Sequence, residues 1–193
     1  MTNLPPFEIT LFNSPISSAP VEFESYTFGP VNSGGLYIEV IPFLLNNIIA
    51  DNDSAKGSGM YISTFALNVE FFNSIILAKT SQTAVCCVDN GSIPLPIFIF
   101  DDFYGPQGTS YCGVCSDQTG KNGNISSDPL FKNPSTGNYG FKVGLPAIDS
   151  GSKSASFLAP SDIIGNKRIS DGNGDGIATV DIGAFEFNPA IHS

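Results

Sequence analysis

Two short apolar motifs recur along this chain at nearly constant spacing, and this repetition restricts the folds that the chain can adopt. Residues 34–38 (GGLYI) recur as residues 58–62 (SGMYI), 24 positions later. Residues 44–49 (LLNNII) recur as residues 71–76 (FFNSII), 27 positions later. A fixed period of this length is typical of a solenoid, in which each repeat is one structural unit that stacks on the next.

A third, weaker copy of both motifs lies in residues 83–88 (TAVCCV) and 98–104 (FIFDDFY). Leucine-rich repeats have units of similar length, but they need Leu and Asn at fixed positions that these units lack. An antiparallel β-sandwich also has short strands at regular intervals, but it does not repeat its motifs at one period. We therefore predict an all-β parallel β-helix with at least three coils between residues 30 and 121.

Successive coils of such a solenoid place equivalent residues about 4.8 Å apart. Apolar residues at equivalent positions should share one face, and recurring Asn side chains should hydrogen-bond along the axis as a ladder. The pairs expected to stack are Leu36 with Met60, Ile38 with Ile62, and Asn46 with Asn73.

The repeats divide the 193 residues into three parts. Residues 1–30 alternate apolar and polar positions and are predicted to form a partial coil or an N-terminal segment. Residues 31–121 form the coils, and residues 122–193, where the repeat stops, form a C-terminal cap. The first residues do not have the pattern of a signal peptide. Three coils are few, so we expect the chain to be a fragment of a longer protein with further coils before residue 1.

The charge balance excludes one class of partner. The chain has 18 acidic residues against eight basic ones, a formal net charge of −10, and Arg168 is its only arginine. Such a chain would be repelled by a nucleic-acid backbone. No stretch is long and apolar enough to span a bilayer, so membrane insertion is not expected either. An acidic surface suits an extracellular protein or one that binds divalent cations.

Four motifs follow one another in the C-terminal third: residues 128–131 (DPLF), 146–151 (PAIDSG), 162–168 (DIIGNKR) and 181–187 (DIGAFEF). In this order they resemble the end of bacterial surface proteins with a right-handed parallel β-helix, the choice-of-anchor Q proteins of the pectin-lyase-like fold group. The resemblance implies that fold and a secreted or cell-surface location. It does not imply one activity, because this fold carries many functions.

Arg168 lies in the third of these motifs and needs a partner if it is buried. The acidic residues of the neighbouring motifs, Asp149, Asp181 and Glu186, are the candidates for a structural ion pair. The alternative is that Arg168 binds a sugar carboxylate or serves as the base of a lyase. Since its motif neighbours all lie in the predicted cap, we predict the structural pair.

Enzymes of the pectin-lyase-like group bind acidic polysaccharide through Ca²⁺ and a basic residue, or cleave sugars with paired Asp residues. Asp101 and Asp102 superficially match such a pair, but neighbouring strand residues point to opposite faces. The coils carry no Arg, and the only histidine is His192. We therefore expect no catalytic residues and predict a non-catalytic surface module, adhesive or glycan-binding. The alternative is a fragment of a polysaccharide lyase or glycoside hydrolase whose catalytic residues lie largely outside this chain.

The four cysteines form two pairs, Cys86 with Cys87 and Cys112 with Cys115. Adjacent cysteines suit zinc poorly. The pairs are 26 positions apart, about one coil, which brings them close enough for disulfides in an exported protein. Buried free thiols are the alternative.

A glycine-rich acidic loop spans residues 171–176 (DGNGDG). Oxygen-bearing side chains at alternate positions followed by glycine are what EF-hand-like loops use to hold Ca²⁺. We predict Asp171, Asn173 and Asp175 as ligands, with Asp181 as a further one. A solvated turn without metal is the alternative.

Overall fold

The computed structural model describes residues 36–38, 43–54, 56–62, 70–88, 95–156 and 158–189. This part of the chain contains twelve short β-strands, no α-helix, and one 3-10 turn, η1 (Pro134–Thr136). The strands are β1 (Leu36–Ile38), β2 (Phe43–Leu45), β3 (Ile48–Ile49), β4 (Met60–Ile62), β5 (Glu70–Phe72), β6 (Ile75–Leu77), β7 (Thr83–Cys87), β8 (Ile97–Ile99), β9 (Asp102–Tyr104), β10 (Thr109–Gly113), β11 (Phe131–Asn133) and β12 (Asn138–Phe141).

The first ten strands form three parallel sheets, and each sheet takes every third strand. Their orders are β1-β4-β7-β10, β2-β5-β8 and β3-β6-β9. Leu36 pairs with Met60 and Ile38 with Ile62, as the first repeat predicts. The second repeat is also reproduced in register, since Leu44 pairs with Phe71. The protein is therefore all-β, with strands that recur at the period of the sequence.

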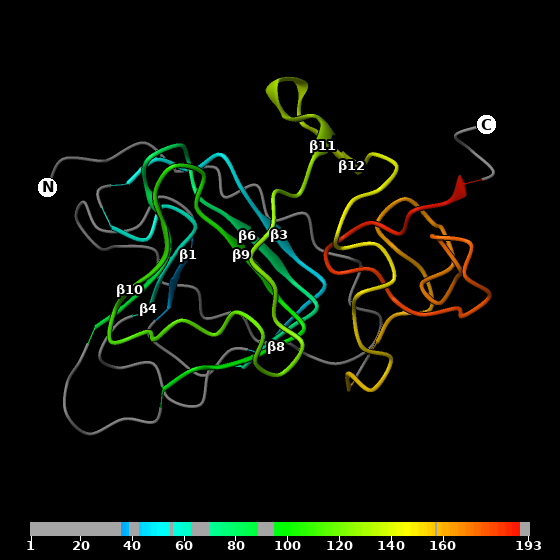
Figure 1. The fold of residues 1–193 in the computed structure, drawn as a ribbon, viewed down its shortest axis with the longest axis horizontal. Helices are drawn as coiled ribbons and strands as arrows, with labels where there is room; N and C mark the ends of the chain where they lie inside the picture. The colour runs from blue at the N-terminus through cyan, green and yellow to red at the C-terminus, as the bar shows by residue number, and fades with distance from the viewer. Residues whose placement is uncertain are drawn as a thin grey trace, which may run out of the picture.

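The three sheets share one apolar interior, to which each contributes buried side chains and which we call the inner cluster (Figure 1). On β4 the alternate residues Met60 and Ile62 belong to this cluster, as strand geometry predicts for side chains that share one face. The fully buried aromatic rings of Phe71 and Phe103 lie in this cluster, with Phe98 between them. Its other members are Leu44, Ile49, Met60, Ile62, Ile76, Ala78, Ala84, Val85, Cys87 and Cys115.

The corner between the second and third sheets repeats a left-handed backbone conformation. Asn46, Asn73 and Phe100 have φ of 53°, 50° and 53°. Each donates its backbone N–H to the equivalent corner of the following turn, for example Asn46 to the Phe72 carbonyl at 3.0 Å. Asn adopts this conformation more easily than most residues, which explains why the sequence repeats Asn here.

The predicted ladder of Asn46 and Asn73 side chains is not present, and a ladder one residue further along takes its place. Asn47 donates its backbone N–H to Ser74 Oγ (3.1 Å), and Ser74 donates its own to Asp101 Oδ1 (2.7 Å). Asp101 continues the series by donating to Asn124 Oδ1 (2.9 Å). The side chains of residues 47, 74, 101 and 124 are inside the corner and buried, so they satisfy backbone groups that water cannot reach.

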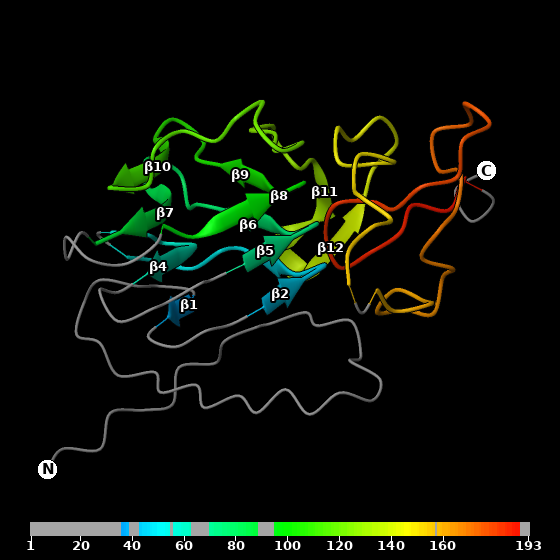
Figure 2. The ribbon, with the colours of Figure 1, turned by 90° about the horizontal axis from the view of Figure 1, so that it is seen from below.

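The C-terminal segment, residues 128–156 and 158–189, lies beside the three parallel sheets rather than across the end strands, where we expected a cap (Figure 2). Its only strands in the described residues are the antiparallel pair β11 and β12. A second apolar cluster joins this segment to Ile48 and Ile75 of β3 and β6. A Cβ on Gly183 would lie 3.0 Å from Ile75 Cδ1 and 3.3 Å from Ile48 Cγ1, so the two surfaces are in close contact.

This lateral position has a physical cause in the repeat itself. Ile48 and Ile75 are at the first position of their strands and point away from the inner cluster, so they form an apolar column on the outside of the coils. When the C-terminal segment covers this column, its apolar surface is removed from water, and this burial stabilises the protein. The predicted coil at residues 1–30 lies outside the described residues. Strand-like pairing of the coils continues to Ile125, slightly beyond the predicted boundary at residue 121.

Candidate functional site

A buried polar network joins the C-terminal segment to the corners at Asn46 and Asn73. The two corner asparagines point their side chains outward into this segment. Asn73 accepts the Ser152 backbone N–H (2.8 Å) and donates to the Ser152 carbonyl (3.0 Å). Asn46 donates to the carbonyls of Asp181 (3.3 Å) and Gly183 (3.2 Å). The amides are engaged by this segment, which is why they do not stack on each other.

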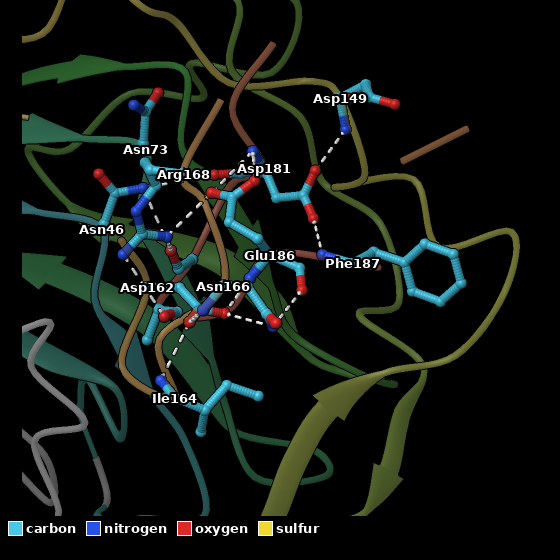
Figure 3. A network of polar contacts seen from close by, with 12 residues as sticks. Asn46, Asn73, Asp149, Asp162, Ile164, Asn166, Arg168, Asp181, Glu186 and Phe187 are labelled. Carbon is cyan, nitrogen blue, oxygen red and sulfur yellow. Dashed lines mark hydrogen bonds and ion pairs between the residues drawn. The ribbon is translucent and has the colours of Figure 1, made fainter. Parts of the chain in front are cut away.

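Arg168 lies behind this contact and is 1% exposed (Figure 3). Its Nη1 is 3.0 Å from Glu186 Oε1, and both side chains are buried. The same nitrogen donates to the Gly183 carbonyl at 3.1 Å. Of the three predicted partners, Glu186 therefore makes the ion pair, which supports a structural role for Arg168.

The other two predicted partners hold backbone instead. Asp181 accepts the backbone N–H of Asp149 (2.7 Å) and that of Phe187 (2.5 Å). Asp149 has a left-handed φ of 52° and accepts the N–H groups of Gly172 (2.9 Å) and Asn173 (2.6 Å). Each carboxylate thus ties together two chain segments that are far apart in sequence.

Asp162 is a fourth carboxylate of this network that the sequence reasoning missed. One oxygen accepts the N–H groups of Ile164 (3.0 Å) and Asn166 (2.7 Å). The other accepts the Asn166 side chain (3.0 Å) and the Glu186 N–H (2.8 Å). Asp followed by Gly and Asn is a local turn pattern that could have indicated the first two bonds. The bond to Glu186 could not be foreseen from local sequence.

Burial and the neighbouring charges change the pKa values of two carboxyl groups in this site. Burial raises the pKa of Asp181 to about 7, against the opposing effect of its two N–H donors. Burial, and then the charge of Asp181, raise the pKa of Glu186 above its usual range, while Arg168 lowers it. The guanidinium cannot lose its proton in a protein. The Asp181–Glu186 pair therefore keeps at least one proton at neutral pH, which reduces the negative charge buried beside Arg168.

The predicted calcium loop is closed by its own hydrogen bonds. Asp171 accepts the N–H groups of Gly174 (2.7 Å) and Gly176 (2.9 Å). Asn173 accepts the N–H of Asp175 at 2.8 Å. Asp149 bonds the start of this loop, whereas Asp181 is directed to other backbone groups. Among the described residues, no three acidic, His or Cys side chains are close enough to form a metal-binding group.

The cysteines join β7 to β10 and to the residues that follow β10. Cys86 is bonded to Cys112 and Cys87 to Cys115, with Cα–Cα distances of 4.5 Å and 5.2 Å. Cys86 and Cys112 are register partners on β7 and β10. The spacing of about one coil brings them together, as the sequence suggested.

The acidic residues of the coils do not form an open catalytic pair. Asp101 and Asp102 are both 0% exposed. Burial raises the pKa of Asp101 well above its usual range, opposed by the N–H groups of Ser74 and Ile99 that it accepts. Lys79 is exposed and pairs with Asp53 at 2.7 Å. The two aspartates point in different directions, and neither reaches Lys79.

Two further observations bear on partners. Within the described residues, no helix has the length and hydropathy needed to cross a membrane. Comparisons of the chain with protein-family models, curated proteins and solved structures found no match.

Proposed function

We propose that this chain is the C-terminal part of a right-handed parallel β-helix from a secreted or cell-surface protein, similar to the choice-of-anchor Q proteins. In this proposal it is a non-catalytic module that binds or displays glycans. One observation carries the proposal: strands one repeat apart pair in parallel register in three separate sheets around one core. A chain that wound repeatedly around that core would produce this pattern.

The use of the buried acidic groups favours a structural module over an enzyme. Asp101, Asp162 and Asp181 accept backbone N–H groups, and Glu186 Oε1 accepts from Arg168 Nη1 at 3.0 Å. Catalytic carboxyl groups need access to a bound sugar. Carboxyl groups already committed to backbone donors contribute to rigidity instead.

The two cysteine pairs favour an oxidising location. Disulfides persist outside the cytosol and are rare inside it. Both bonds link successive turns, so they would brace the end of the stack after export.

A glycan-binding test separates this proposal from the lyase or hydrolase alternative. The purified chain is applied to immobilised polysaccharides and surface glycans, and the same mixtures are assayed for unsaturated or reducing sugar products, with and without Ca²⁺. We expect retention on at least one glycan and no product. Product formation that is lost in Lys79→Ala would establish the enzymatic alternative. If the chain neither binds a glycan nor forms product, the claim that it binds glycans is refuted, and a role as a spacer between other domains remains.

Calcium binding is proposed as an accessory property of the loop at residues 171–176. Its support is the alternation of Asp171, Asn173 and Asp175 on one turn beside Asp149; Asn173 and Asp175 are exposed and Asp171 is half-buried. Binding would be weak, with a Kd of about 10⁻⁴ M or higher, as in extracellular calcium modules.

A further inference from the structure

One buried acidic residue occupies a position that the repeat otherwise gives to isoleucine. Ile48 pairs with Ile75, and Ile75 pairs with Asp102, at the first position of three successive strands. The three residues are 1%, 0% and 0% exposed. Asp102 therefore extends the column of Ile48 and Ile75. The chain passes over Asp102 where it enters the C-terminal segment.

The polypeptide that crosses Asp102 is residues 124–128, which we call the junction. Ile125 forms a parallel bridge with Asp102, and Ser127 donates its N–H to Asp102 Oδ1 at 2.9 Å. Ser126 Oγ donates to the Phe103 carbonyl at 2.8 Å. Backbone hydrogen bonds also hold the start of the junction, from Ile125 to the Asp101 carbonyl (2.8 Å) and from Phe103 to the Ile125 carbonyl (3.2 Å). Asp102 is the residue of β9 whose side chain holds the later part, at Ser127.

The second oxygen of this carboxyl group is not satisfied. Asp102 Oδ2 is buried and has no hydrogen-bond partner. The charged groups that act on Asp102 are also acidic: Asp128 faces it from the end of the junction, and Asp101 precedes it on the turn into β9. An ionised carboxylate here would lack both a cation and a second donor, which is costly in a buried site. The neutral acid avoids most of that cost.

We propose that Asp102 is a proton-dependent latch, whose neutral carboxyl group keeps the junction packed on β9 and whose ionisation loosens it. Burial, and to a lesser degree the charge of Asp128, raise the pKa of Asp102 to about 7, against the effect of the Ser127 donor. The latch therefore operates between mildly acidic and neutral pH. Loosening at this point would change how firmly the C-terminal segment is held against the coils.

The sign and size of the effect follow from linkage. In the open junction Asp102 has its ordinary pKa near 3.8, and in the closed junction about 7. The closed junction is favoured most when the pH is below 3.8, and this advantage is lost as the pH rises to about 7. Opening of the junction should therefore increase about a hundredfold between about pH 5 and pH 8.

Hydrogen–deuterium exchange measured across this pH range, corrected for the intrinsic exchange rate, tests the latch in the intact chain. Peptides that cover the junction should lose protection by that factor in the wild type. In Asp102→Asn this pH-dependent loss of protection should be much smaller than in the wild type. Peptides around Asp181 should keep their own pH dependence in the variant, because a separate carboxyl group causes it. The exposed Asp117→Asn is the matched control and should behave as the wild type.

Two results would overturn the latch: wild-type protection of the junction that does not change with pH, or an unchanged pH dependence in Asp102→Asn. If Asp102→Asn does not fold, Asp128→Asn decides the question. Removal of that neighbouring charge lowers the pKa of Asp102, so the loss of protection should end at lower pH. An unshifted curve in Asp128→Asn would contradict the proposal.

Discussion

The clamp between Asn73 and Ser152 offers the most direct test of how the C-terminal segment is attached. Asn73 makes two hydrogen bonds to the backbone of Ser152, and each contributes about 0.5–1.5 kcal/mol net. Asn73 also has a left-handed backbone with φ of 50°. Alanine adopts this conformation at a cost of about 1–2 kcal/mol, whereas glycine adopts it without that cost. Asn73→Ala should therefore lower the free energy of unfolding by about 2–5 kcal/mol, and Asn73→Gly by about 1 kcal/mol less.

Thermal and denaturant unfolding of purified variants measure these differences. In a domain of this size about 1 kcal/mol shifts Tm by roughly 2–4 °C, so the Asn73→Ala shift is readily measured. Asn122 is the matched control, because it has the same φ of 50° but is exposed, and its amide reaches only the Phe98 carbonyl at 3.5 Å. Asn122→Ala should cost only the conformational part, about 1–2 kcal/mol.

The comparison of the three variants would refute the reasoning in two ways. If Asn73→Gly is as stable as the wild type, the two hydrogen bonds to Ser152 contribute nothing. If Asn73→Ala and Asn122→Ala are equally destabilised, the corner conformation alone accounts for the loss. Limited proteolysis gives an independent reading, since a weakened clamp should expose the segment around Ser152 to cleavage before the coils unfold.

Three further predictions concern pH, redox state and calcium. Burial raises the folded-state pKa of Asp181 to about 7, so its contribution to stability is present below its ordinary pKa of 3.8 and is lost as pH rises to 7. Tm should fall between about pH 5 and pH 8 by the equivalent of about 2–3 kcal/mol for this group, and a Tm that rises over that range would contradict it. Reduction of both disulfides should destabilise the chain by about 3–4 kcal/mol, the entropy of closing one loop of this length, because the two bonds close nearly the same loop. Cys86→Ser/Cys112→Ser alone should cost much less, since Cys87–Cys115 still closes that loop, and free thiols in the non-reduced protein would rule the bonds out. Calorimetric titration with Ca²⁺ should show weak binding that Asp171→Ala/Asp175→Ala abolishes; no heat and no change in Tm at millimolar Ca²⁺ would leave the loop as a turn.

The repeat in the sequence was sufficient to predict the parallel pairing and its register. Pairing between Leu36 and Met60, or Leu44 and Phe71, links copies of one motif, and stacked repeats bring such copies together wherever the chain is regular. The spacing of the cysteines is informative for the same reason, since about one coil separates Cys86 from Cys112. Residues that are one repeat apart in the sequence become neighbours in the structure.

The period also contained a signal that was assigned to the wrong position. Residues 47, 74 and 101 are polar in all three repeats, and they form the ladder that we predicted for the asparagines one position earlier. Adjacent residues at a corner point in different directions, one into the coil and one out of it. Sequence alone gives the period of the asparagines but not which of two neighbouring side chains faces inward.

Only the tertiary structure decided where the C-terminal segment lies and what its acidic residues contact. Asn46 is bonded to Gly183, 137 positions away in the sequence, and no repeat relates the two. The outer column that begins with Ile48 attracts an apolar segment, but other apolar surfaces, including the end of the stack, could have satisfied the same requirement. The choice of Glu186 as the partner of Arg168 depends on that docking, because the three candidate carboxylates are equivalent until the backbone donors around each are fixed. Local sequence determines which residues must be satisfied, whereas the contacts that satisfy them are set by surfaces that meet only in the folded chain.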